Sequence, residues 1–428
     1  MKTSTLFSAV SFALVFCSSS ILAQTTPDNV TATIVANADA DNIDLTVLGD
    51  TLDAALTSIV DVYESASIPD NSTTTTASRR SFGRFGRFAK RDDAPIVDVH
   101  THAVPSWYKA LVPTTGGNPT PSWDINTYLS FMASEGITHS VFSFSAPSAN
   151  VFQGAPLPTI ALARLMNEQA AAYCRANPTK LSFYAVVPLP YTAAAIVEAN
   201  YALDVLGASG IFLTSNFEGI YLGNTQFTPF FDAMNSRSDK QIFYIHPGTP
   251  YIKVNGKLVE ANPTPYPTGN IEFYFETART LEDLTLTRTI HNFTNIDYII
   301  PHVGGAFPAT IDRILKSAPA IYDASFQIFS TRFWWDSAGP TYYHQVAGLL
   351  GYGIPASQLL FGTDYPYAPS FTQAASLAAV KSSTLITDDQ KTALFTTNPQ
   401  ALFGSKISCM LFVCCYTVYE PDASLHAA

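Results

Sequence analysis

Short apolar stretches alternate with longer amphipathic stretches along the chain from about residue 92 onward. The short stretches are rich in β-branched and aromatic residues, which is typical of buried strands. Strands are therefore predicted at Pro95–His100, Thr138–Ser145, Phe183–Val187, Gly210–Thr214, Gln241–His246, Asp297–His302, Arg332–Ser337 and Leu359–Asp364. Helical spacing predicts helices between them, among others at Leu162–Asn177, Ala193–Leu206, Phe227–Ser236 and Thr280–Asn292. Strands joined by such crossovers favour a parallel sheet.

Eight parallel strands with intervening helices predict a (β/α)8 barrel, the TIM-barrel architecture, over residues 92–405. Barrels of this type typically need about 250 residues, and this part of the chain is long enough. A doubly wound open sheet is the alternative fold. No GxGxxG turn opens any of the helical stretches, which weighs against a dinucleotide-binding sheet.

The first 91 residues differ in composition from the rest of the chain. Lys2, the apolar run 6–17 and the small residue Ala23 are typical of a secretory signal peptide over residues 1–23. Residues 24–91 predict a largely disordered leader or propeptide with one amphipathic helix over 43–65. This stretch ends in Lys90-Arg91, which resembles a kexin-type processing site. We therefore expect a secreted protein that is cleaved near Arg91.

Charge and hydrophobicity narrow the range of partners. The 428 residues carry a formal net charge of −11 and only 13% are charged, which excludes nucleic acid as an expected partner. The 47% of hydrophobic residues allow a large buried core. The amino-terminal apolar run is shorter than the roughly 20 residues that span a bilayer, so no stable membrane span is expected. Residues 406–428 form an atypical tail. We expect that this tail is an artefact of the gene model, such as a translated intron.

Candidate catalytic chemistry lies at or just after the carboxyl ends of predicted strands, the rim where barrel enzymes collect their active-site residues. The candidates are His100 and His102 on the first strand, His246 on the fifth, His302 on the sixth and Asp364 on the eighth. A His-x-His pair at a strand end places two imidazoles on one face, because side chains alternate along a strand. A third imidazole and a carboxylate complete a ligand set suited to a divalent metal such as zinc.

These motifs resemble the amidohydrolase superfamily, and within it the aminocarboxymuconate-semialdehyde decarboxylase branch. The resemblance is strongest to 6-methylsalicylate decarboxylases, and it covers about residues 95–404. It is carried by the rim residues above and by the stretches Leu213–Asn216, Tyr221–Asn224, Phe227–Pro229, Ile271–Phe273 and Phe333–Ala338.

The resemblance implies a role for each rim residue. The metal ligands are His100, His102, His246 and Asp364, and His302 is the catalytic histidine, with Asp364 as the other candidate for proton delivery. One divalent ion is implied, with zinc favoured and manganese as the alternative, because Leu213–Asn216 lacks the lysine that bridges two metals in binuclear members. No arginine occurs between Arg91 and Arg164, which favours a monocarboxylate substrate over a dicarboxylate.

The implied reaction is the non-oxidative decarboxylation of a small aromatic carboxylic acid, an ortho-hydroxybenzoate similar to 6-methylsalicylate, with release of CO2. Trp107, Trp335 and Tyr365 are candidates for the wall of an aromatic pocket, and Asp98 and Asp336 for orienting the metal-binding side chains. Two alternatives stay open: a metal-dependent hydrolase of a lactone or amide, and a secreted binding protein without activity. A homodimer is suggested by analogy alone.

Overall fold

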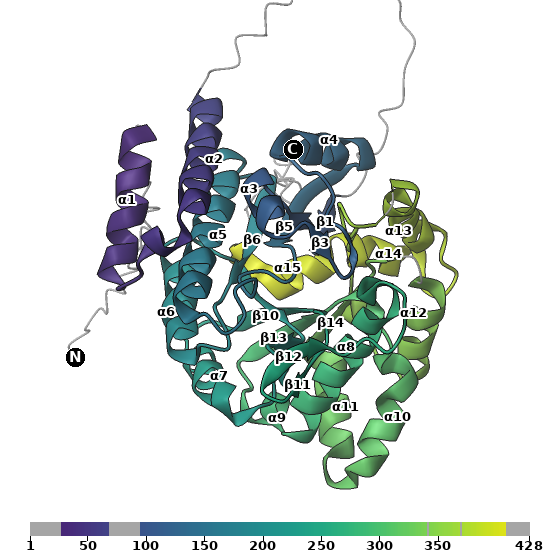
Figure 1. Cartoon of the computed structure of the whole chain (residues 1–428). Helices are drawn as coiled ribbons and strands as arrows, with labels where there is room; N and C mark the ends of the chain where they lie inside the picture. The colour runs from purple at the N-terminus through teal and green to yellow at the C-terminus, as the bar shows by residue number, and fades with distance from the viewer. Residues whose placement is uncertain (1–26, 68–94, 340–341, 369, 408–428) are drawn as a thin grey trace, which may run out of the picture.

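Eight parallel strands form the centre of the computed structural model, which describes residues 27–67, 95–339, 342–368 and 370–407 (Figure 1). The strands are β1 (Ile96–Asp98), β5 (Ile137–Phe144), β6 (Leu181–Val186), β7 (Gly210–Thr214), β10 (Gln241–His246), β13 (Ile296–Ile300), β14 (Phe333–Asp336) and β15 (Leu359–Leu360). All eight predicted strands are present. The predicted signal peptide, the residues around Arg91 and residues 408–428 of the predicted tail lie outside the described residues. The first two tail residues, Lys406 and Ile407, are described, and Ile407 is buried.

The strands follow one another around the sheet in chain order, and the sheet closes nearly completely into a barrel. Strand β2 (His102–Ala103) extends β1 along β5. The last strand meets the first through backbone hydrogen bonds, from Val99 N to Phe361 O at 2.9 Å and from His102 N to Tyr365 O at 2.7 Å. The predicted (β/α)8 barrel is therefore confirmed, and the open doubly wound sheet is wrong.

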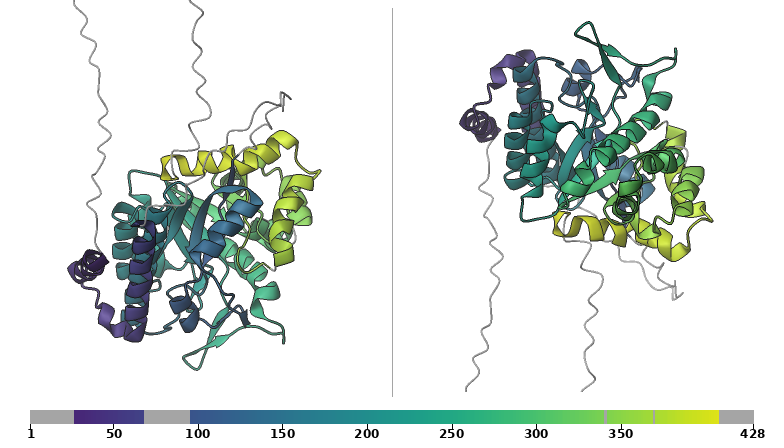
Figure 2. Two further views of the ribbon diagram at one scale, coloured as in Figure 1. Left: turned by 90° about the horizontal axis from the view of Figure 1, so that it is seen from above. Right: turned by 90° about the horizontal axis from the view of Figure 1, so that it is seen from below.

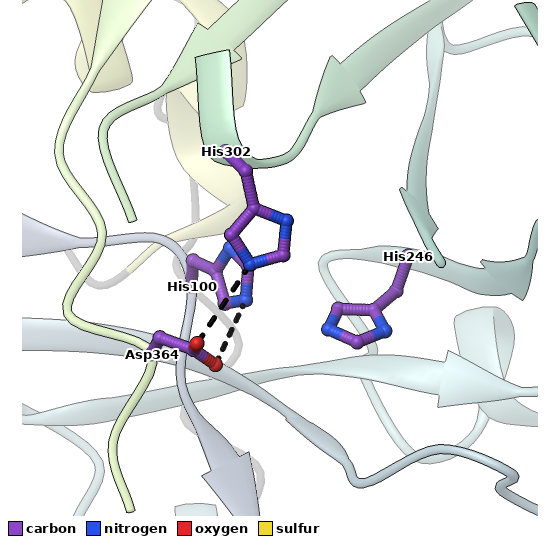
Figure 3. Close-up of side chains that lie close together, drawn as sticks. All are labelled: His100, His246, His302 and Asp364. Atoms are coloured by element: carbon purple, nitrogen blue, oxygen red, sulfur yellow. Dashed lines mark ion pairs between the residues drawn. The ribbon is translucent and has the colours of Figure 1, made fainter. Parts of the chain in front are cut away.

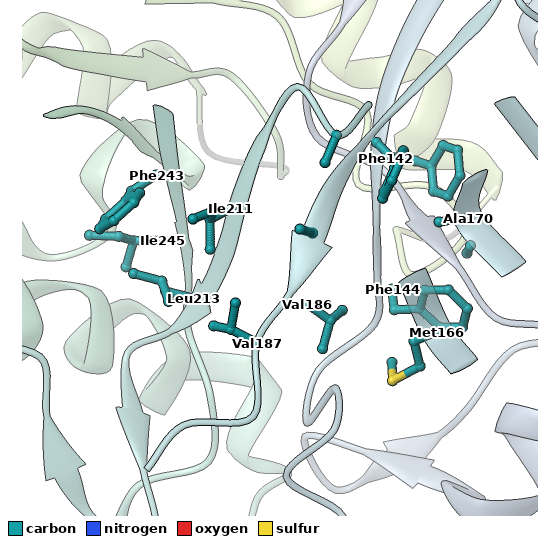
Figure 4. Close-up of a cluster of buried hydrophobic side chains, with 14 of the residues drawn as sticks. Phe142, Phe144, Met166, Ala170, Val186, Val187, Ile211, Leu213, Phe243 and Ile245 are labelled. Atoms are coloured by element: carbon teal, nitrogen blue, oxygen red, sulfur yellow. The ribbon is translucent and has the colours of Figure 1, made fainter. Parts of the chain in front are cut away.

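Alternation along the strands divides the apolar side chains into two buried groups, as expected for a parallel sheet covered on both faces. One side of β7 and β10 carries Ile211, Leu213, Phe243 and Ile245, which pack toward the surrounding helices (Figure 4). The alternate positions contribute to a second buried cluster, which contains Val97, Val99, Val141, Tyr184, Phe212, Ile242, Tyr244, Ile299, Trp334, Leu360, Phe403 and Ile407. Tight packing on both faces fixes where each strand ends, and hence where the rim residues lie.

Helices cover the outside of the barrel and follow most of the strands. They are α3 (Ser106–Leu111), α4 (Ile125–Glu135), α5 (Pro156–Ala176), α6 (Thr192–Asp204), α7 (Thr228–Asn235), α8 (Thr268–Leu286), α9 (Thr289–Asn292), α10 (Phe307–Ser317), α11 (Tyr322–Thr331), α12 (Tyr342–Gly351), α13 (Ser370–Ser382), α14 (Asp388–Phe395) and α15 (Thr397–Phe403). The predicted helix Thr280–Asn292 is instead the end of α8 followed by α9, because Arg288 has the left-handed φ of 63° between them. None of the helices in the described parts of the chain is long and apolar enough to cross a membrane.

Three short antiparallel hairpins lie in the connections between strands and helices. They are β3–β4 (Thr114–Thr115 and Asn118–Pro119), β8–β9 (Asn216–Phe217 and Ile220–Tyr221) and β11–β12 (Tyr251–Val254 and Lys257–Glu260). The β11–β12 hairpin projects from the body of the molecule (Figure 2). The β3–β4 hairpin contacts the start of α8, since Gly269 N donates to Gly116 O at 2.7 Å.

An amino-terminal helical segment packs against the outside of the barrel. It comprises α1 (Pro27–Ala40), a short 3-10 helix (Leu45–Leu48) and α2 (Asp50–Ser67), and α2 lies along α5 (Figure 1). Buried apolar residues of the segment, among them Ile34, Leu45 and Ile59, belong to the same core cluster as α5. The prediction that residues 24–91 are largely disordered is therefore wrong for 27–67, because this stretch has enough apolar positions to bury one face of each helix.

A buried arginine ties this segment to the barrel. The Arg164 side chain on α5 is fully buried, and its Nε donates to Glu198 Oε2 at 2.8 Å. Its Nη2 donates to Asp41 Oδ2, at the end of α1, at 2.6 Å. Asn167 also donates to Glu198, at 2.7 Å. Two carboxylates, one from each part of the chain, thus compensate one buried charge.

We expect Glu198→Ala to lower the free energy of unfolding by about 3–5 kcal/mol, because it leaves the charge of Arg164 buried with less compensation. Asp41→Ala should cost about 1 kcal/mol, because the Asp41 side chain is 31% exposed and water screens the pair. Asp204→Ala is the matched control: its pair with Arg237 lies on the surface, and the change should cost at most about 0.5 kcal/mol. Urea unfolding measures the free energy of unfolding of each variant. Equal losses of free energy in all three variants would contradict the expected order.

Candidate metal centre

Three histidines and one aspartate meet at the carboxyl end of the barrel, each from a different strand end. His100 follows β1, His246 is the last residue of β10, His302 follows β13 and Asp364 follows β15. One ligand atom from each lies within 4.8 Å of the others (Figure 3). Tight convergence of imidazole nitrogens and a carboxylate oxygen is the donor set of a divalent metal site.

Asp364 lies between three histidine rings. Its Oδ1 is 3.4 Å from His100 Nε2 and 3.4 Å from His102 Nε2, and its Oδ2 is 3.7 Å from His302 Nε2. His102 is buried, and its Nδ1 lies 3.1 Å from the Ser143 hydroxyl. The structure thus brings together all five residues predicted for the centre. The four whose ligand atoms lie within 4.8 Å of one another include His302, where the resemblance put His102.

The buried Asp336 at the end of β14 holds two of these histidines in place. Its Oδ2 lies 2.9 Å from His100 Nδ1, and its Oδ1 accepts from the backbone N–H of His302 at 3.1 Å. With Nδ1 occupied, His100 presents Nε2 to the centre. A carboxylate behind a metal-binding histidine fixes the ring and raises its basicity as a ligand. The predicted orienting role of Asp336 agrees with these contacts.

Asp98 makes a second set of contacts beneath the centre. Its Oδ1 accepts from the backbone N–H of His100 at 3.1 Å and of Thr363 at 3.2 Å, and its Oδ2 accepts from the Thr363 hydroxyl at 2.6 Å. Burial raises the pKa of Asp98 to about 7. Asp98 therefore joins the ends of β1 and β15, and so positions both His100 and Asp364.

Burial and mutual repulsion set the protonation of the rings. Burial lowers the pKa of His246 well below its usual value, and the neighbouring histidines lower it further, so this ring is neutral and offers a lone pair. Burial would raise the pKa of Asp364, but the close His100, His102 and His302 rings hold it well below its usual value. His246 and Asp364 are thus in the forms that bind metal. Burial lowers the pKa of His100, but its contacts with Asp336 and Asp364 raise it to about 10, so a metal would displace a proton from this ring.

An unsatisfied nitrogen supports the fit to a metal. His100 Nε2 is buried and has no hydrogen-bond partner, although it faces Asp364 at 3.4 Å. A buried donor or acceptor without a partner costs roughly 1–3 kcal/mol, so natural proteins rarely leave one without a reason. A cation between His100, His246 and Asp364 would satisfy it.

The backbone is strained at the residues that form the centre. His302, Val303 and Asp364 have φ values of 53°, 53° and 60°. Left-handed φ is rare outside glycine, above all for a β-branched residue such as Val303. Strain of this kind persists where the surrounding structure fixes it, and it clusters at active sites. The turns after β13 and β15 are therefore shaped to aim His302 and Asp364 inward.

The centre opens into a cavity of about 1150 Å³. His102, His246, His302 and Asp364 contribute to its lining, and no lysine or arginine is among its described lining residues. The remaining lining residues come mainly from the β3–β4 hairpin, the start of α8 and the segment after Asp364. A carboxylate ligand in this cavity therefore lacks a cationic side chain to pair with, and a metal ion at the centre would supply the missing charge.

The three aromatic residues predicted to wall the pocket are absent from the described lining. Trp335 is buried against Phe307, because the neighbouring Asp336 faces inward and alternation turns Trp335 toward the helices. The Trp107 indole donates to Gln169 at 3.2 Å. Tyr365 stacks on Phe131, with ring centroids 4.4 Å apart. All three positions are packing positions.

Other aromatic rings line the cavity. Phe273 lies edge-on to His246 with centroids 6.2 Å apart, and Tyr274 stacks on His302 at 5.4 Å. The Tyr367 ring lies 5.5 Å from His102. Sequence reasoning noted Phe273 only as part of a family-like stretch and missed the other two. A helix start at Thr268 instead of Thr280 would have placed Phe273 and Tyr274 in the first turns beside the strand ends.

Comparison with known proteins agrees with this geometry. The family model described as amidohydrolase matches residues 97–405. A decarboxylase of Aspergillus niger is 32% identical over 295 residues, covering 64% of this chain and 78% of that protein. A 6-methylsalicylic acid decarboxylase of Aspergillus aculeatus is 29% identical over 289 residues, covering 64% of this chain and 84% of that protein.

A solved structure shows the same fold. The 5-carboxyvanillate decarboxylase of Novosphingobium aromaticivorans, complexed with manganese and 4-hydroxy-3-methoxy-5-nitrobenzoic acid, matches with a TM-score of 0.62. It is 17% identical in sequence, and the match covers 73% of this chain and 96% of that one.

We expect Asp336→Asn to weaken divalent-metal binding by about 10–100-fold, because the amide orients the His100 ring less firmly and lowers its basicity. Metal titration of the apoprotein by calorimetry measures this. Asp283→Asn is the control, since Asp283 accepts from Gly223 N at 2.6 Å outside the centre. Unchanged affinity in the Asp336 variant would show that His100 is oriented by other contacts.

Proposed function

Because the chain belongs to the amidohydrolase family, we propose that it is a metal-dependent, non-oxidative decarboxylase, a carboxy-lyase that releases CO2 from a small aromatic acid. The substrate class is an ortho-hydroxybenzoate such as 6-methylsalicylate. One observation carries the proposal: a buried cluster of imidazoles and one carboxylate faces a cavity without a lysine or arginine in its described lining. The relatives that act on 6-methylsalicylic acid support the substrate class.

His100, His246 and Asp364 would hold one divalent ion, with His102 and His302 on either side of Asp364. When bound, the ion supplies positive charge for the substrate's carboxylate and the adjacent phenolic oxygen. We propose zinc, because nitrogen and carboxylate donors suit it. Manganese is the alternative, supported by its presence in the 5-carboxyvanillate decarboxylase.

The protein's own residues then handle one proton. Decarboxylation replaces the carboxylate on the ring by hydrogen: a proton is added to the ring carbon, the bond to the carboxylate breaks, and its electrons restore the aromatic ring as CO2 leaves. His302 and Asp364 face each other at 3.7 Å and both line the cavity. Because Asp364 is held in its ionised form, His302 is the proposed donor of the proton to the ring carbon. Tyr274 fixes the His302 ring by stacking on it.

We also propose that the protein is secreted, with the mature chain starting near Asp92. Support comes from the sequence alone: the signal-peptide pattern of residues 1–23 and the dibasic Lys90-Arg91. Amino-terminal sequencing of protein from culture medium tests it, and a start upstream of Lys90 would contradict the cleavage. A homodimer is proposed by analogy with relatives of this branch, and sedimentation of the purified protein tests it.

The decisive assay uses the purified protein loaded with Zn²⁺ or Mn²⁺. It is incubated with 6-methylsalicylate, dihydroxybenzoates and a panel of lactones, with and without a chelator. We expect CO2 release from a hydroxybenzoate that the chelator abolishes. Ring-opened lactone would identify a hydrolase instead, and inactivity across the panel would favour a binding protein.

Substitution of the proton-handling pair should abolish turnover without unfolding the protein. We expect His302→Asn to lower kcat by about 10²–10⁴-fold, the usual contribution of a positioned proton donor. Asp364→Asn should lower both kcat and metal affinity, because Asp364 is also a proposed metal ligand. His291→Asn is the matched control, because His291 bonds to Ser325 at 3.0 Å outside the cavity. A variant of the pair that retained kcat would remove that residue from the proton transfer.

A further inference from the structure

The cavity is larger than a single substituted ring requires. Pockets that enclose a drug-sized ligand usually measure roughly 300–1,000 Å³. The cavity here measures about 1150 Å³, yet a hydroxybenzoate with one methyl group is much smaller than a drug-sized ligand. The proposed substrate would fill the part next to the histidines and leave the outer part to water.

The outer part is lined by apolar side chains of α8. Ile271 and Phe275 lie one helical turn apart on the same face of the helix and both line the cavity. They are 47% and 40% exposed, so much of their apolar surface meets water. Pro119, Pro121 and Ala306 add further apolar lining. Burial of such surface by a ligand is favourable in proportion to its area.

A second hollow adjoins this wall. It measures about 210 Å³ and lies between α8 and α10, lined by Ala278, Thr310 and Ile314 among others. It shares two lining residues, Phe275 and Ala306, with the main cavity. The Arg279 guanidinium lies 5.8 Å from the Phe275 ring and is held by Glu276 at 2.9 Å. The two hollows therefore adjoin at Phe275 and Ala306, and the charged side chains of Arg279, Glu282 and Arg313 border the second one.

We infer that the site accepts an aromatic acid that carries an apolar chain of several carbons on its ring. The ring lies at the metal centre, and the chain runs along Ile271 and Phe275 toward the second hollow. This inference rests on the proposed function, since it specifies the substrate class of the same site. A cavity specific for a small substrate encloses it closely. This cavity instead exposes Ile271 and Phe275 to water, which favours a ligand long enough to cover them.

A series of 2-hydroxybenzoates with methyl, pentyl and undecyl chains at carbon 6 tests the inference on the metal-loaded, full-length protein. We expect KM to fall about tenfold from methyl to pentyl. Each fully buried methylene should strengthen binding by up to about fourfold. A chain on a half-exposed wall is only partly buried, so it gains less than this for each methylene. A pentyl chain that ends in a hydroxyl should lose part of the gain.

Variants of the wall locate the effect. Phe275→Ala and Ile271→Ser should narrow the ratio of the methyl KM to the pentyl KM to about threefold. Leu286→Ala is the matched control, because Leu286 is another exposed apolar residue of α8 but lines neither described hollow. Its ratio should equal that of the unaltered protein. An unaffected ratio in the Phe275 and Ile271 variants would overturn the inference.

Failure of the inference and failure of the proposed function give different results. Turnover of the methyl acid with no gain for longer chains overturns the inference and leaves the decarboxylase assignment intact, and it would point to a second protein copy covering the wall. Absence of turnover for every acid overturns the function. In that case calorimetric binding of the same acids still decides the inference, because tighter binding of the pentyl acid supports it and equal binding overturns it.

Discussion

The buried carboxylate of Asp336 is the interaction on which the arrangement of the centre depends. It lies at the end of β14 and contacts the His100 ring with one oxygen and the His302 backbone with the other. Asp98 does the same for His100 and Thr363, and so joins the first strand to the last. The Asp98 contacts therefore strengthen the closure of the barrel, beside the backbone hydrogen bonds of Val99 and His102, and also position the centre.

The charge distribution follows from this arrangement. Ionised Asp364 and neutral His246 meet in a buried place, and the described cavity lining adds no lysine or arginine. In a low-dielectric site a single divalent ion then dominates the electrostatics. The aromatic rings on His246 and His302 fix the imidazoles sterically without adding charge. The part of a ligand beyond its carboxylate is therefore recognised by shape and apolar contact, as Ile271 and Phe275 on α8 allow.

The sequence predicted the barrel, its eight strands and the five residues of the centre, because period-two alternation and strand ends are local properties. It failed where tertiary packing decides. Trp335 was assigned to the pocket although its neighbour Asp336 already occupied the inward position. The start of α8 was missed, and with it Tyr274. The amphipathic helix predicted over 43–65 overlaps α2, but the apolar positions of α1 did not stand out against its polar composition. Packing of the segment on α5 explains its order.

The amino-terminal helices have a consequence for how the protein is produced. Their Asp41 reaches the buried Arg164, and their apolar faces cover α5. If the chain were cut at Arg91, only non-covalent contacts with α5 and Arg164 would hold these helices on the barrel. A recombinant chain that starts at Asp92 would expose the apolar surface of α5 and tend to aggregate. A recombinant chain that starts before Pro27 keeps this surface covered. After cleavage, an affinity tag at its amino terminus would purify the barrel through the non-covalent contact between the helices and α5.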